Sequence, residues 1–334
     1  MGGSVIVTGG AGYIGSHACK ALARAGFVPV TYDNLSIGNR WAVRWGPFEL
    51  GDIHDSARLH DVFRAHRPVG VLHFAALALV GESVAAPSLY YRTNVAGLCC
   101  VLDVCRARDV NAFVFSSTCA VYGAPAQLPI DETTPPAPIN PYGASKLMAE
   151  RVLADYDAAY GLRHVALRYF NAAGADPEGE IGERRDVETH LVPLAVDALA
   201  GRRPPIRIMG EDYPTPDGTA VRDYIHVSDL AEAHVRALRH LLTGGASRVL
   251  NLGVGRGYSV REVLDAAARV AGRPVPSESA PRRPGDPPAL VADPTAAQTL
   301  FGRDLAQRSS LDHIVETAWR WQNSDFYDRV FFAR

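Results

Sequence analysis

The chain has 334 residues, 47% of them hydrophobic, and a formal net charge of −2 at pH 7. This length suits one large domain with a smaller companion. A near-neutral charge without a long basic run argues against nucleic acid and anionic membrane surfaces as partners. The most apolar run, residues 69–80, contains His73 and is too short to span a bilayer. We therefore expect a globular protein that binds neither nucleic acid nor membranes.

The N-terminal segment has the pattern of a dinucleotide-binding unit. A short apolar stretch, residues 4–8, leads into Gly9, Gly12 and Gly15, and residues 17–25 have helical composition. Strand, glycine-rich turn and helix in this order are the fingerprint of such a site. Gly9 allows the tight turn, Gly12 lets the backbone approach a pyrophosphate, and Gly15 lets the helix pack closely on the strand. The helix N-terminus then offers free N–H groups to the phosphates.

The next predicted strand, residues 28–32, is followed by Asp33. An acid about 20 residues beyond the glycines is where the ribose hydroxyls of NAD are held. A carboxylate there would repel the 2′-phosphate of NADP. The sequence therefore predicts NAD as the cofactor.

Five cysteines stand at positions 19, 99, 100, 105 and 119, and none has the spacing of a metal or redox pair. We expect buried, reduced thiols and no metal site, as in a cytoplasmic protein. A strand at the N-terminus leaves no signal peptide to expect. Proline clusters at residues 135–138 and 282–288 predict loops.

Apolar strand-like segments alternate with helix-like segments along the first half of the chain. This alternation predicts an α/β fold with a doubly wound parallel sheet, in which ligands bind beyond the carboxyl ends of the strands. The predicted strands are residues 5–8, 28–32, 48–50, 69–74, 113–116 and 165–168. Glycine, acidic and hydroxyl residues follow them at Gly9, Asp33, Asp52 and Thr118, where such a ligand would lie.

Tyr142 and Lys146 are four residues apart in a segment of good helix composition that begins near Pro141. On a helix they share one face, one turn apart. A neighbouring ammonium and a positively charged nicotinamide ring both favour the phenolate, so we expect them to lower the pKa of Tyr142 toward the range that a general base needs. Thr118, just past a predicted strand, could hydrogen-bond the same reacting oxygen.

These residues resemble the extended short-chain dehydrogenase/reductases, and within them the UDP-glucose 4-epimerase family. The resemblance covers nearly the whole chain, and residues 212–227 are its most specific part. It is carried by residues 9–17, 32–35, 51–52, 73–76, 80–83, 142–146, 167–171, 212–219, 221–227 and 282–286.

The resemblance implies tightly held NAD, a UDP-hexose substrate and a place in galactose metabolism. Tyr142 would take the C4 proton while NAD takes the C4 hydride, and the return of hydride to the other face of the 4-keto sugar would interconvert UDP-glucose and UDP-galactose. Lys146 would hold the nicotinamide ribose, and Thr118 would assist. The residues that match cofactor positions are Gly9, Gly12, Tyr13, Ile14, Gly15, Asp33, Asn34, Leu35, Ser36, Gly38, Asp52, Ile53, Phe74, Ala75, Ala76, Asn94, Ser116, Tyr142, Lys146 and Tyr169. Those that match the UDP-sugar side are Thr118, Tyr142, Asn171, Leu191, Arg207, Ile208, Met209, Arg222, Tyr224, Arg283, Asp286 and Leu290.

Two positions depart from the pattern of some members. Ala78 stands where a lysine can help to hold NAD, so the cofactor is held less tightly or by other groups. Leu290 stands where some members carry tyrosine over the sugar C2 substituent. A smaller side chain there predicts room for N-acetylated sugars.

The residues beside Thr118 help to distinguish epimerisation from the reactions of related enzyme classes. Nucleotide-sugar 4,6-dehydratases and UDP-glucuronate decarboxylases resemble this chain, but both carry an acid near the catalytic hydroxyl, where Cys119 and Ala120 stand here. A non-catalytic NAD-binding regulator would not need Tyr142 and Lys146. A 4-epimerase of another nucleotide sugar, such as UDP-xylose, is left open.

For domain organisation, we expect an NAD-binding domain over residues 1–171 and 222–253, and a UDP-sugar-binding domain over residues 172–221 and 254–334. The resemblance also implies a homodimer formed by two helices of each copy. Residues 95–108 and 147–160 are the candidates for these helices, although an amphipathic helix could equally face an internal core.

Overall fold

The computed structural model describes residues 2–283 and 285–332. Pro284, which belongs to the predicted proline-rich loop, lies outside the described residues, as do Met1 and residues 333–334. None of the helices in the described ranges has the length and apolar character that a bilayer crossing requires.

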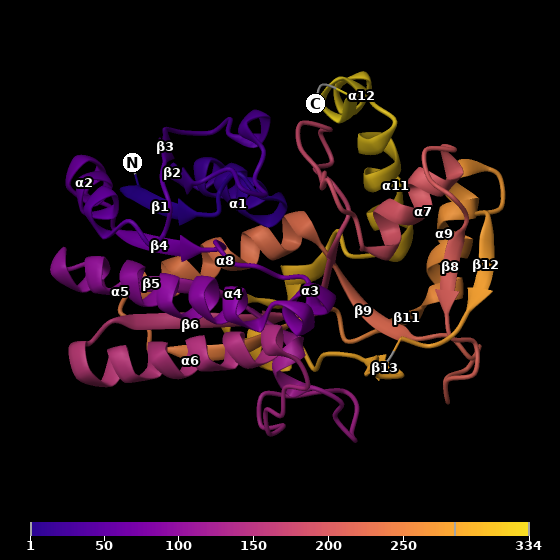
Figure 1. Ribbon diagram of the computed structural model, residues 1–334. Coiled ribbons are helices and arrows are strands. Elements are labelled where there is room, and N and C mark those ends of the chain that lie inside the picture. The colour runs from indigo at the N-terminus through magenta and orange to yellow at the C-terminus, as the bar shows by residue number, and fades with distance from the viewer. Residues whose placement is uncertain (1, 284, 333–334) are drawn as a thin grey trace.

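A seven-stranded sheet, in the order β10-β6-β5-β4-β1-β2-β3, forms the larger layer of the molecule (Figure 1). All of its neighbouring strands pair in parallel, which confirms the predicted doubly wound α/β fold. Six of these strands were predicted, with ends that differ by at most two residues, as is usual for element boundaries, and β10 was not among the predicted strands. The strands of the sheet are β1 (Ser4–Thr8), β2 (Val28–Asp33), β3 (Phe48–Leu50), β4 (Gly70–His73), β5 (Ala112–Thr118), β6 (Arg163–Tyr169) and β10 (Arg248–Leu252).

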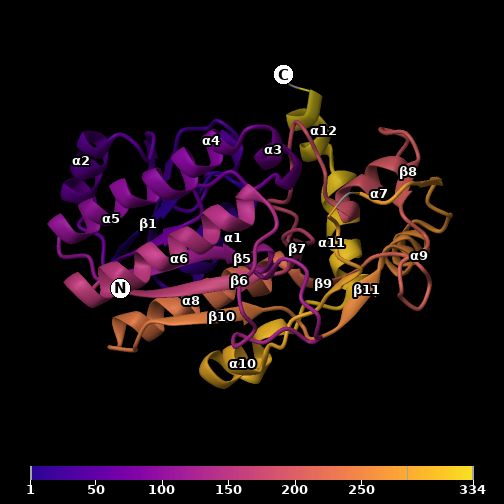
Figure 2. The same cartoon turned by 60° about the horizontal axis from the view of Figure 1, so that its bottom comes forward.

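Helices cover both faces of this sheet, because its strands are apolar on both sides. One core joins α1 and α8 to the sheet, and a second core joins α2, α5 and α6 to the opposite face (Figure 2). The predicted first helix over residues 17–25 begins four residues earlier, at Tyr13, and ends at Arg24. The helical elements up to α8 are α1 (Tyr13–Arg24), η1 (Arg40–Ala42), α2 (Ser56–His66), α3 (Val80–Ala85), α4 (Pro87–Tyr91), the π-helix η2 (Arg92–Ala96), α5 (Gly97–Ala107), η3 (Cys119–Tyr122), α6 (Pro141–Tyr160), α7 (Leu191–Leu199) and α8 (Val227–Leu242).

A smaller layer, on the right of Figure 1, contains two further sheets and a core of its own formed with α7, α9 and α11. In one sheet β9 lies between β11 and β13 and also pairs with β7; in the other, β8 pairs with β12. The elements not yet named are β7 (Asn171–Ala173), β8 (Ile206–Met209), β9 (Val221–His226), β11 (Gly257–Ser259), α9 (Val260–Ala271), β12 (Ser277–Ala280), β13 (Ala289–Leu290), α10 (Thr295–Phe301), η4 (Arg303–Ala306), α11 (Leu311–Gln322) and α12 (Asp325–Phe332).

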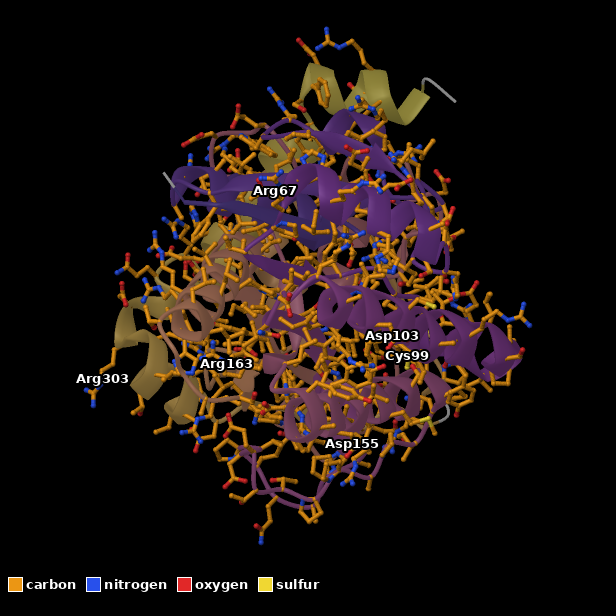
Figure 3. The ribbon with its side chains drawn as sticks, turned by 90° about the vertical axis from the view of Figure 1, so that its left-hand side faces the viewer. Arg67, Cys99, Asp103, Asp155, Arg163 and Arg303 are labelled. Carbon is orange, nitrogen blue, oxygen red and sulfur yellow. The ribbon has the colours of Figure 1, made fainter. Side chains whose placement is uncertain are left out.

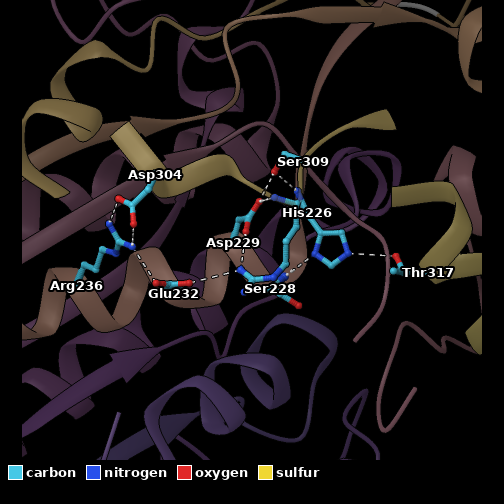
Figure 4. A network of polar contacts seen from close by, with 9 residues as sticks. His226, Ser228, Asp229, Glu232, Arg236, Asp304, Ser309 and Thr317 are labelled. Carbon is cyan, nitrogen blue, oxygen red and sulfur yellow. Dashed lines mark hydrogen bonds and ion pairs between the residues drawn. The ribbon is translucent and has the colours of Figure 1, made fainter. Parts of the chain in front are cut away.

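Polar contacts tie α8 to the C-terminal part of the chain (Figure 4). Asp229 of α8 accepts hydrogen bonds from the Ser309 hydroxyl at 2.7 Å and the Arg308 amide at 2.8 Å. Two helical turns further along α8, Arg236 forms an ion pair with Asp304 at 2.6 Å. Because α8 packs on the central sheet, these contacts fix the C-terminal segment against the larger layer.

The segment after β7 is held against α1 at two points. The Tyr13 hydroxyl donates to the carbonyl of Gly174 at 2.6 Å. Two helical turns further along α1, the buried Lys20 ammonium forms an ion pair with Asp176 at 2.7 Å. The helix that follows the glycine-rich turn is therefore tied directly to the chain entering the smaller layer.

The cysteines agree only in part with the prediction. All five are unpaired thiols, but Cys99 and Cys100 of α5 are half-buried, whereas Cys19, Cys105 and Cys119 are buried. Cys99 and Cys100 differ because they lie on the side of α5 that turns away from the sheet. The domain boundaries at residues 171, 221 and 253 stay a prediction.

Candidate active site

The glycine-rich turn between β1 and α1 leaves no room for side chains. Gly9 has a φ of +72°, and a Cβ atom there would lie 2.6 Å from the amide nitrogen of Ala75. A Cβ atom on Gly15 would lie 2.2 Å from the carbonyl oxygen of Gly9. Gly12 is the N-cap of α1, so Tyr13, Ile14 and Gly15 form its first turn. Backbone N–H groups are thus exposed to a ligand at the helix N-terminus, which suits a dinucleotide diphosphate.

Asp33 closes this end of the sheet. Its Oδ2 accepts the amide of Ala11 at 3.0 Å, and its Oδ1 accepts the amide of Leu35 at 2.8 Å. Burial raises the pKa of the carboxyl, and these two bonds oppose the rise. A Cβ atom on Gly38 would lie 2.8 Å from Asp33 Oδ1, so this loop also approaches the carboxylate closely.

The neighbouring strand ends add the other predicted cofactor residues. The Asn34 amide donates to Asp52 at 2.8 Å, and its oxygen accepts the amide N–H of Ser36 at 3.0 Å. Asn34, Ser36 and Asp52 therefore lie together beyond the ends of β2 and β3. Ile53 is buried beside Gly97. Phe74, Ala75 and Ala76 follow β4, and the backbone of Phe74 and Ala75 reaches Gly9: a Cβ atom there would lie 2.8 Å from the carbonyl carbon of Phe74.

Asn94 lies on the π-helix η2 and connects the loop after β4 to α6. Its side chain forms hydrogen bonds in both directions with the backbone of Leu77, at 2.9 and 3.0 Å. It also donates to the Ser145 hydroxyl at 3.0 Å. Asn94 is therefore a buried structural link, and it brings the loop over residues 74–77 next to Tyr142 and Lys146.

Helix α6 begins at Pro141, as predicted, and is capped by Asn140, whose side chain accepts the amide of Gly143 at 2.9 Å. Tyr142 therefore lies in the first turn and Lys146 in the second. The Lys146 ammonium donates to the carbonyl of Ser116 on β5 at 2.8 Å. The Ser116 hydroxyl meets the Tyr169 hydroxyl at 2.5 Å.

Without a bound nicotinamide, the pKa of Tyr142 is raised, so the Lys146 ammonium alone does not lower it as expected. Burial raises the pKa of the Tyr142 phenol, the neighbouring Tyr169 adds to the rise, and the Thr118 hydroxyl lowers it. The physical reason is that the Lys146 ammonium is directed to the Ser116 carbonyl and is itself buried, which lowers its pKa to about 7. Thr118 is the last residue of β5, so its hydroxyl is the polar group that β5 brings to Tyr142.

The predicted substrate residues lie on the smaller layer. Asn171 of β7 pairs in register with Tyr224 of β9, and Arg222 of β9 forms an ion pair with Asp286. Leu191 is the first residue of α7. The register pair and the ion pair thus bring Asn171 next to Tyr224 and Arg222 next to Asp286.

The remaining predicted substrate residues are dispersed. Arg207 of β8 is exposed and faces Glu278 at 3.8 Å, while Ile208 is buried in the core of the smaller layer and Met209 ends the strand. Arg283 is exposed in the loop before β13. Ile208 can therefore offer a ligand only its backbone, since its side chain is enclosed.

Leu290 of β13 pairs in register with Arg222 and is 8% exposed. Its side chain belongs to a small core with Cys119, Tyr122 and Phe170. Because Cys119 directly follows Thr118, Leu290 lies in the layer of side chains behind the Thr118 hydroxyl.

Sequence reasoning missed the buried polar groups beneath the site, above all Glu150 and Arg168. They form an ion pair at 2.5 Å, with both side chains less than a tenth exposed. The four-residue spacing from Lys146 to Glu150 was the available signal.

Comparison with known proteins places the chain in a family. The model of the "NAD dependent epimerase/dehydratase family" matches residues 5–253. A curated UDP-glucose 4-epimerase from Rhizobium leguminosarum bv. trifolii is 54% identical over 96% of this chain and 97% of its own length. The chain belongs to this family, among its UDP-glucose 4-epimerases.

Solved structures agree with this assignment. The UDP-glucose 4-epimerase from Brucella ovis in complex with NAD has a TM-score of 0.93 and 55% identity, covering 95% of this chain and 97% of that one. The enzyme from Bifidobacterium longum, in complex with NAD+ and UDP, has a TM-score of 0.91 and 38% identity, covering 96% and 98%. NAD is thus the cofactor of this epimerase family, and the glycine turn, Asp33 and the α1 N-terminus described above fit it.

The carboxylate of Asp33 gives a first expectation for this family member. Apoprotein should bind NAD at least about tenfold more tightly than NADP, because a 2′-phosphate would meet a like charge in a partly desolvated place. Asp33→Asn should narrow the difference, since the charge is removed while one acceptor oxygen stays. Isothermal titration with both nucleotides measures this. Tighter binding of NADP to the unaltered apoprotein would contradict the assignment of Asp33.

Proposed function

We propose that this protein interconverts UDP-glucose and UDP-galactose by epimerisation at C4, in an NAD-dependent reaction through a 4-keto sugar. The observation that carries the proposal is the arrangement on α6, where Tyr142 meets Thr118 and Lys146 binds the end of β5. This pair stands next to the glycine-rich turn through Asn94 and the loop after β4. Family membership at 54% identity over nearly the whole chain supports the same activity.

When bound, NAD accepts the C4 hydride and returns it to the opposite face of the sugar. The side chains supply the proton transfer and the positions. Tyr142 takes the proton of the C4 hydroxyl and later returns it, which is general acid–base catalysis. Thr118 hydrogen-bonds the same oxygen, and Lys146 places a positive charge one helical turn from the phenol. Tyr142 must be a phenolate to accept this proton, and the positive charges of Lys146 and of the bound nicotinamide would favour that form over the neutral phenol of the protein without cofactor.

We assign the diphosphate of the UDP-sugar to Arg222 and Arg283. Guanidinium groups bind phosphate oxygens in pairs, which suits this role. In the structure Arg222 pairs with Asp286. The carboxylate therefore holds the guanidinium in place beside β13, and it would accept the sugar nucleotide's hydroxyl or amide donors.

A label-tracing experiment tests the proposed function. UDP-[4-²H]glucose should yield UDP-galactose that keeps deuterium at C4, and no free NADH should accumulate, because the hydride returns to the molecule it left. Denaturing the purified protein should release about one nicotinamide dinucleotide per chain. Stoichiometric NADH with loss of label would identify a dehydrogenase. Failure to convert the hexoses while converting UDP-xylose would make it a pentose 4-epimerase, and no turnover of any sugar would leave the NAD-binding regulator.

The position of Leu290 leads to a prediction about the sugar C2 substituent. The unaltered enzyme should turn over UDP-N-acetylglucosamine, because leucine is shorter than tyrosine and the acetamido group must clear the wall as the sugar rotates. Leu290→Tyr should lower kcat/KM for that sugar by about tenfold while largely sparing UDP-glucose. Steady-state kinetics with both sugars and both proteins measures it. An equal loss for the two sugars would show that Leu290 only packs behind Thr118.

We infer that the protein is a homodimer that works in the cytoplasm. Helices α5 and α6 lie side by side, joined by a hydrogen bond of 2.8 Å from the Tyr156 hydroxyl to Asp103 (Figure 3). Met148 and Tyr160 of α6 are each 48% exposed, which provides apolar area for a second copy. Light scattering should give twice the chain mass of 35.9 kDa. The unpaired thiols are those of a reducing compartment.

A further inference from the structure

Helix α6 carries a third polar side chain on the face that bears Tyr142 and Lys146. Glu150 follows Lys146 by four residues, so phenol, ammonium and carboxylate stand on three successive turns. Glu150 is 6% exposed and Lys146 is 2% exposed. A carboxylate buried this deeply destabilises the fold unless partners compensate it.

The partners of Glu150 fix its position completely. Its Oε1 accepts the Ser117 hydroxyl at 2.5 Å and the Nε of Arg168 at 2.9 Å, and its Oε2 accepts the Nη2 of Arg168 at 2.5 Å. Arg168 is held in turn by its Nη1, which donates to the Tyr122 hydroxyl at 2.9 Å. A two-point guanidinium contact sets both distance and orientation. The negative charge therefore cannot move away from its turn of α6.

Two consecutive residues of β5 hold two consecutive turns of α6. The carbonyl of Ser116 accepts the Lys146 ammonium at 2.8 Å, and the hydroxyl of Ser117 donates to Glu150. Any displacement of Glu150 along or away from β5 would consequently move Lys146 relative to Ser116.

Glu150 also supplies a negative charge near the Lys146 ammonium, which has no carboxylate in direct contact. Among residues 2–283 and 285–332, no carboxylate lies within ion-pair distance of the Lys146 ammonium, which otherwise contacts the ring of Phe115 at 4.8 Å. His73 on β4 is neutral, since burial together with Lys146 lowers its pKa to about 3. Tyr142 on α6 and Tyr169 on β6 are neutral phenols, because burial raises the pKa of each.

The protonation of Lys146 is thus a balance between two effects. Burial lowers the pKa of the ammonium and the Glu150 carboxylate raises it, with a net value of about 7. Arg168, the cation packed against this region from β6, has its charge engaged by Glu150. Without the carboxylate, burial alone would act on Lys146.

We propose that Glu150 is a positioning residue for the reaction: held by Ser117 and Arg168, it fixes the turn of α6 that follows Lys146, and its negative charge favours the ammonium form of Lys146. The proposal rests on the proposed function, because that function gives Lys146 its role. It deepens that function by adding Glu150, one turn beyond Lys146 on α6, to the residues on which the reaction depends.

The test is the pH profile of Glu150→Gln, which removes the charge and keeps the shape. The basic limb of kcat for UDP-galactose should move to lower pH by about one unit, the size of effect expected from one nearby opposite charge. KM should change little, and kcat on the acidic side should stay within a few-fold of the parent. As a readout independent of turnover, NAD retained after gel filtration should begin to fall at a pH about one unit lower in the variant than in the parent.

Two further variants make the result decisive. Asp197→Asn is the matched control. Asp197 lies on α7, remote from α6 in the sequence, and its buried carboxylate forms an ion pair with Arg202 at 2.9 Å. Its neighbours on α7 belong to the core of the smaller layer and not to the core that contains α6. The substitution should lower stability without moving the basic limb. If Glu150→Gln does not fold, Glu150→Gln with Arg168→Met removes the whole ion pair and leaves no unpaired buried charge, an exchange that proteins often tolerate. Its basic limb should also move down.

The outcomes separate cleanly. A lowered basic limb in the Glu150 variants alone supports the proposal. A uniform loss of kcat at every pH, with unchanged NAD retention, would show that Glu150 is structural and overturn it. An unaltered protein that epimerises no sugar would instead defeat the proposed function and would be recognised before any variant is made.

Discussion

Tyr142→Phe is expected to lower kcat for UDP-galactose by about 10²–10⁴-fold, the usual effect of losing a general base. The variant should still carry NAD, because phenylalanine keeps the ring that packs edge-on against Tyr90 at 6.4 Å between ring centroids. Turnover measured beside the nicotinamide released on denaturation checks both statements.

A matched control lies on the same helix. Tyr160→Phe makes the same chemical change at the last residue of α6, where the ring is half-exposed and packs against Tyr156. It should leave kcat within about twofold of the parent, as expected for a surface position. If Tyr142→Phe also stayed within a few-fold, Tyr142 could not be the base.

Gly15→Ala is expected to abolish NAD retention. The added Cβ would lie 2.2 Å from the carbonyl oxygen of Gly9 and 2.9 Å from the Cα of Gly10, and both neighbours are backbone. The helix must therefore move away from the turn, which withdraws the N–H groups that face the diphosphate. We expect the Kd for NAD to rise at least tenfold, roughly 1.4 kcal/mol of binding free energy, so that the purified variant loses its dinucleotide. Absorbance of the denatured, filtered protein measures it.

Gly81→Ala provides the comparison for that variant. Gly81 lies in α3, and a Cβ there would have no atom within 4 Å. Alanine is favoured over glycine in a helix by about 0.5–1 kcal/mol, so this variant should be as stable as the parent or slightly more stable and should keep its NAD. Equal NAD content in the two alanine variants would contradict the role given to Gly15.

The sequence allowed six of the seven strands of the central sheet to be predicted, because most of them contain apolar runs and several end at residues with a distinctive chemistry, whereas β10 was not predicted. Gly9, Asp33 and Thr118 lie at strand ends as expected, and Tyr142 and Lys146 share a face of a helix that starts at Pro141. Local patterns of this kind depend on neighbours in the chain, so they can be read without knowing the tertiary structure.

Features that depend on distant contacts could not be predicted in the same way. The pKa of Tyr142 rises because the folded chain buries the phenol and directs Lys146 to Ser116, and neither fact is local. Strands as short as β13, with two residues, have no pattern of their own and exist through pairing with β9. The burial of Leu290 in the core behind Cys119 likewise follows from this pairing.

The position of β10 has a consequence for synthesis of the chain on the ribosome. Strand β6 ends at Tyr169, but the strand that pairs with its outer edge, β10, ends only at Leu252. At the usual elongation rates, β6 therefore waits roughly 4–17 seconds with an unpaired apolar edge. Such an edge is a template for pairing with other chains. Solubility during expression should thus depend on how fast the ribosome translates the segment between these two strands, and slow codons placed there should favour aggregation of the nascent chain.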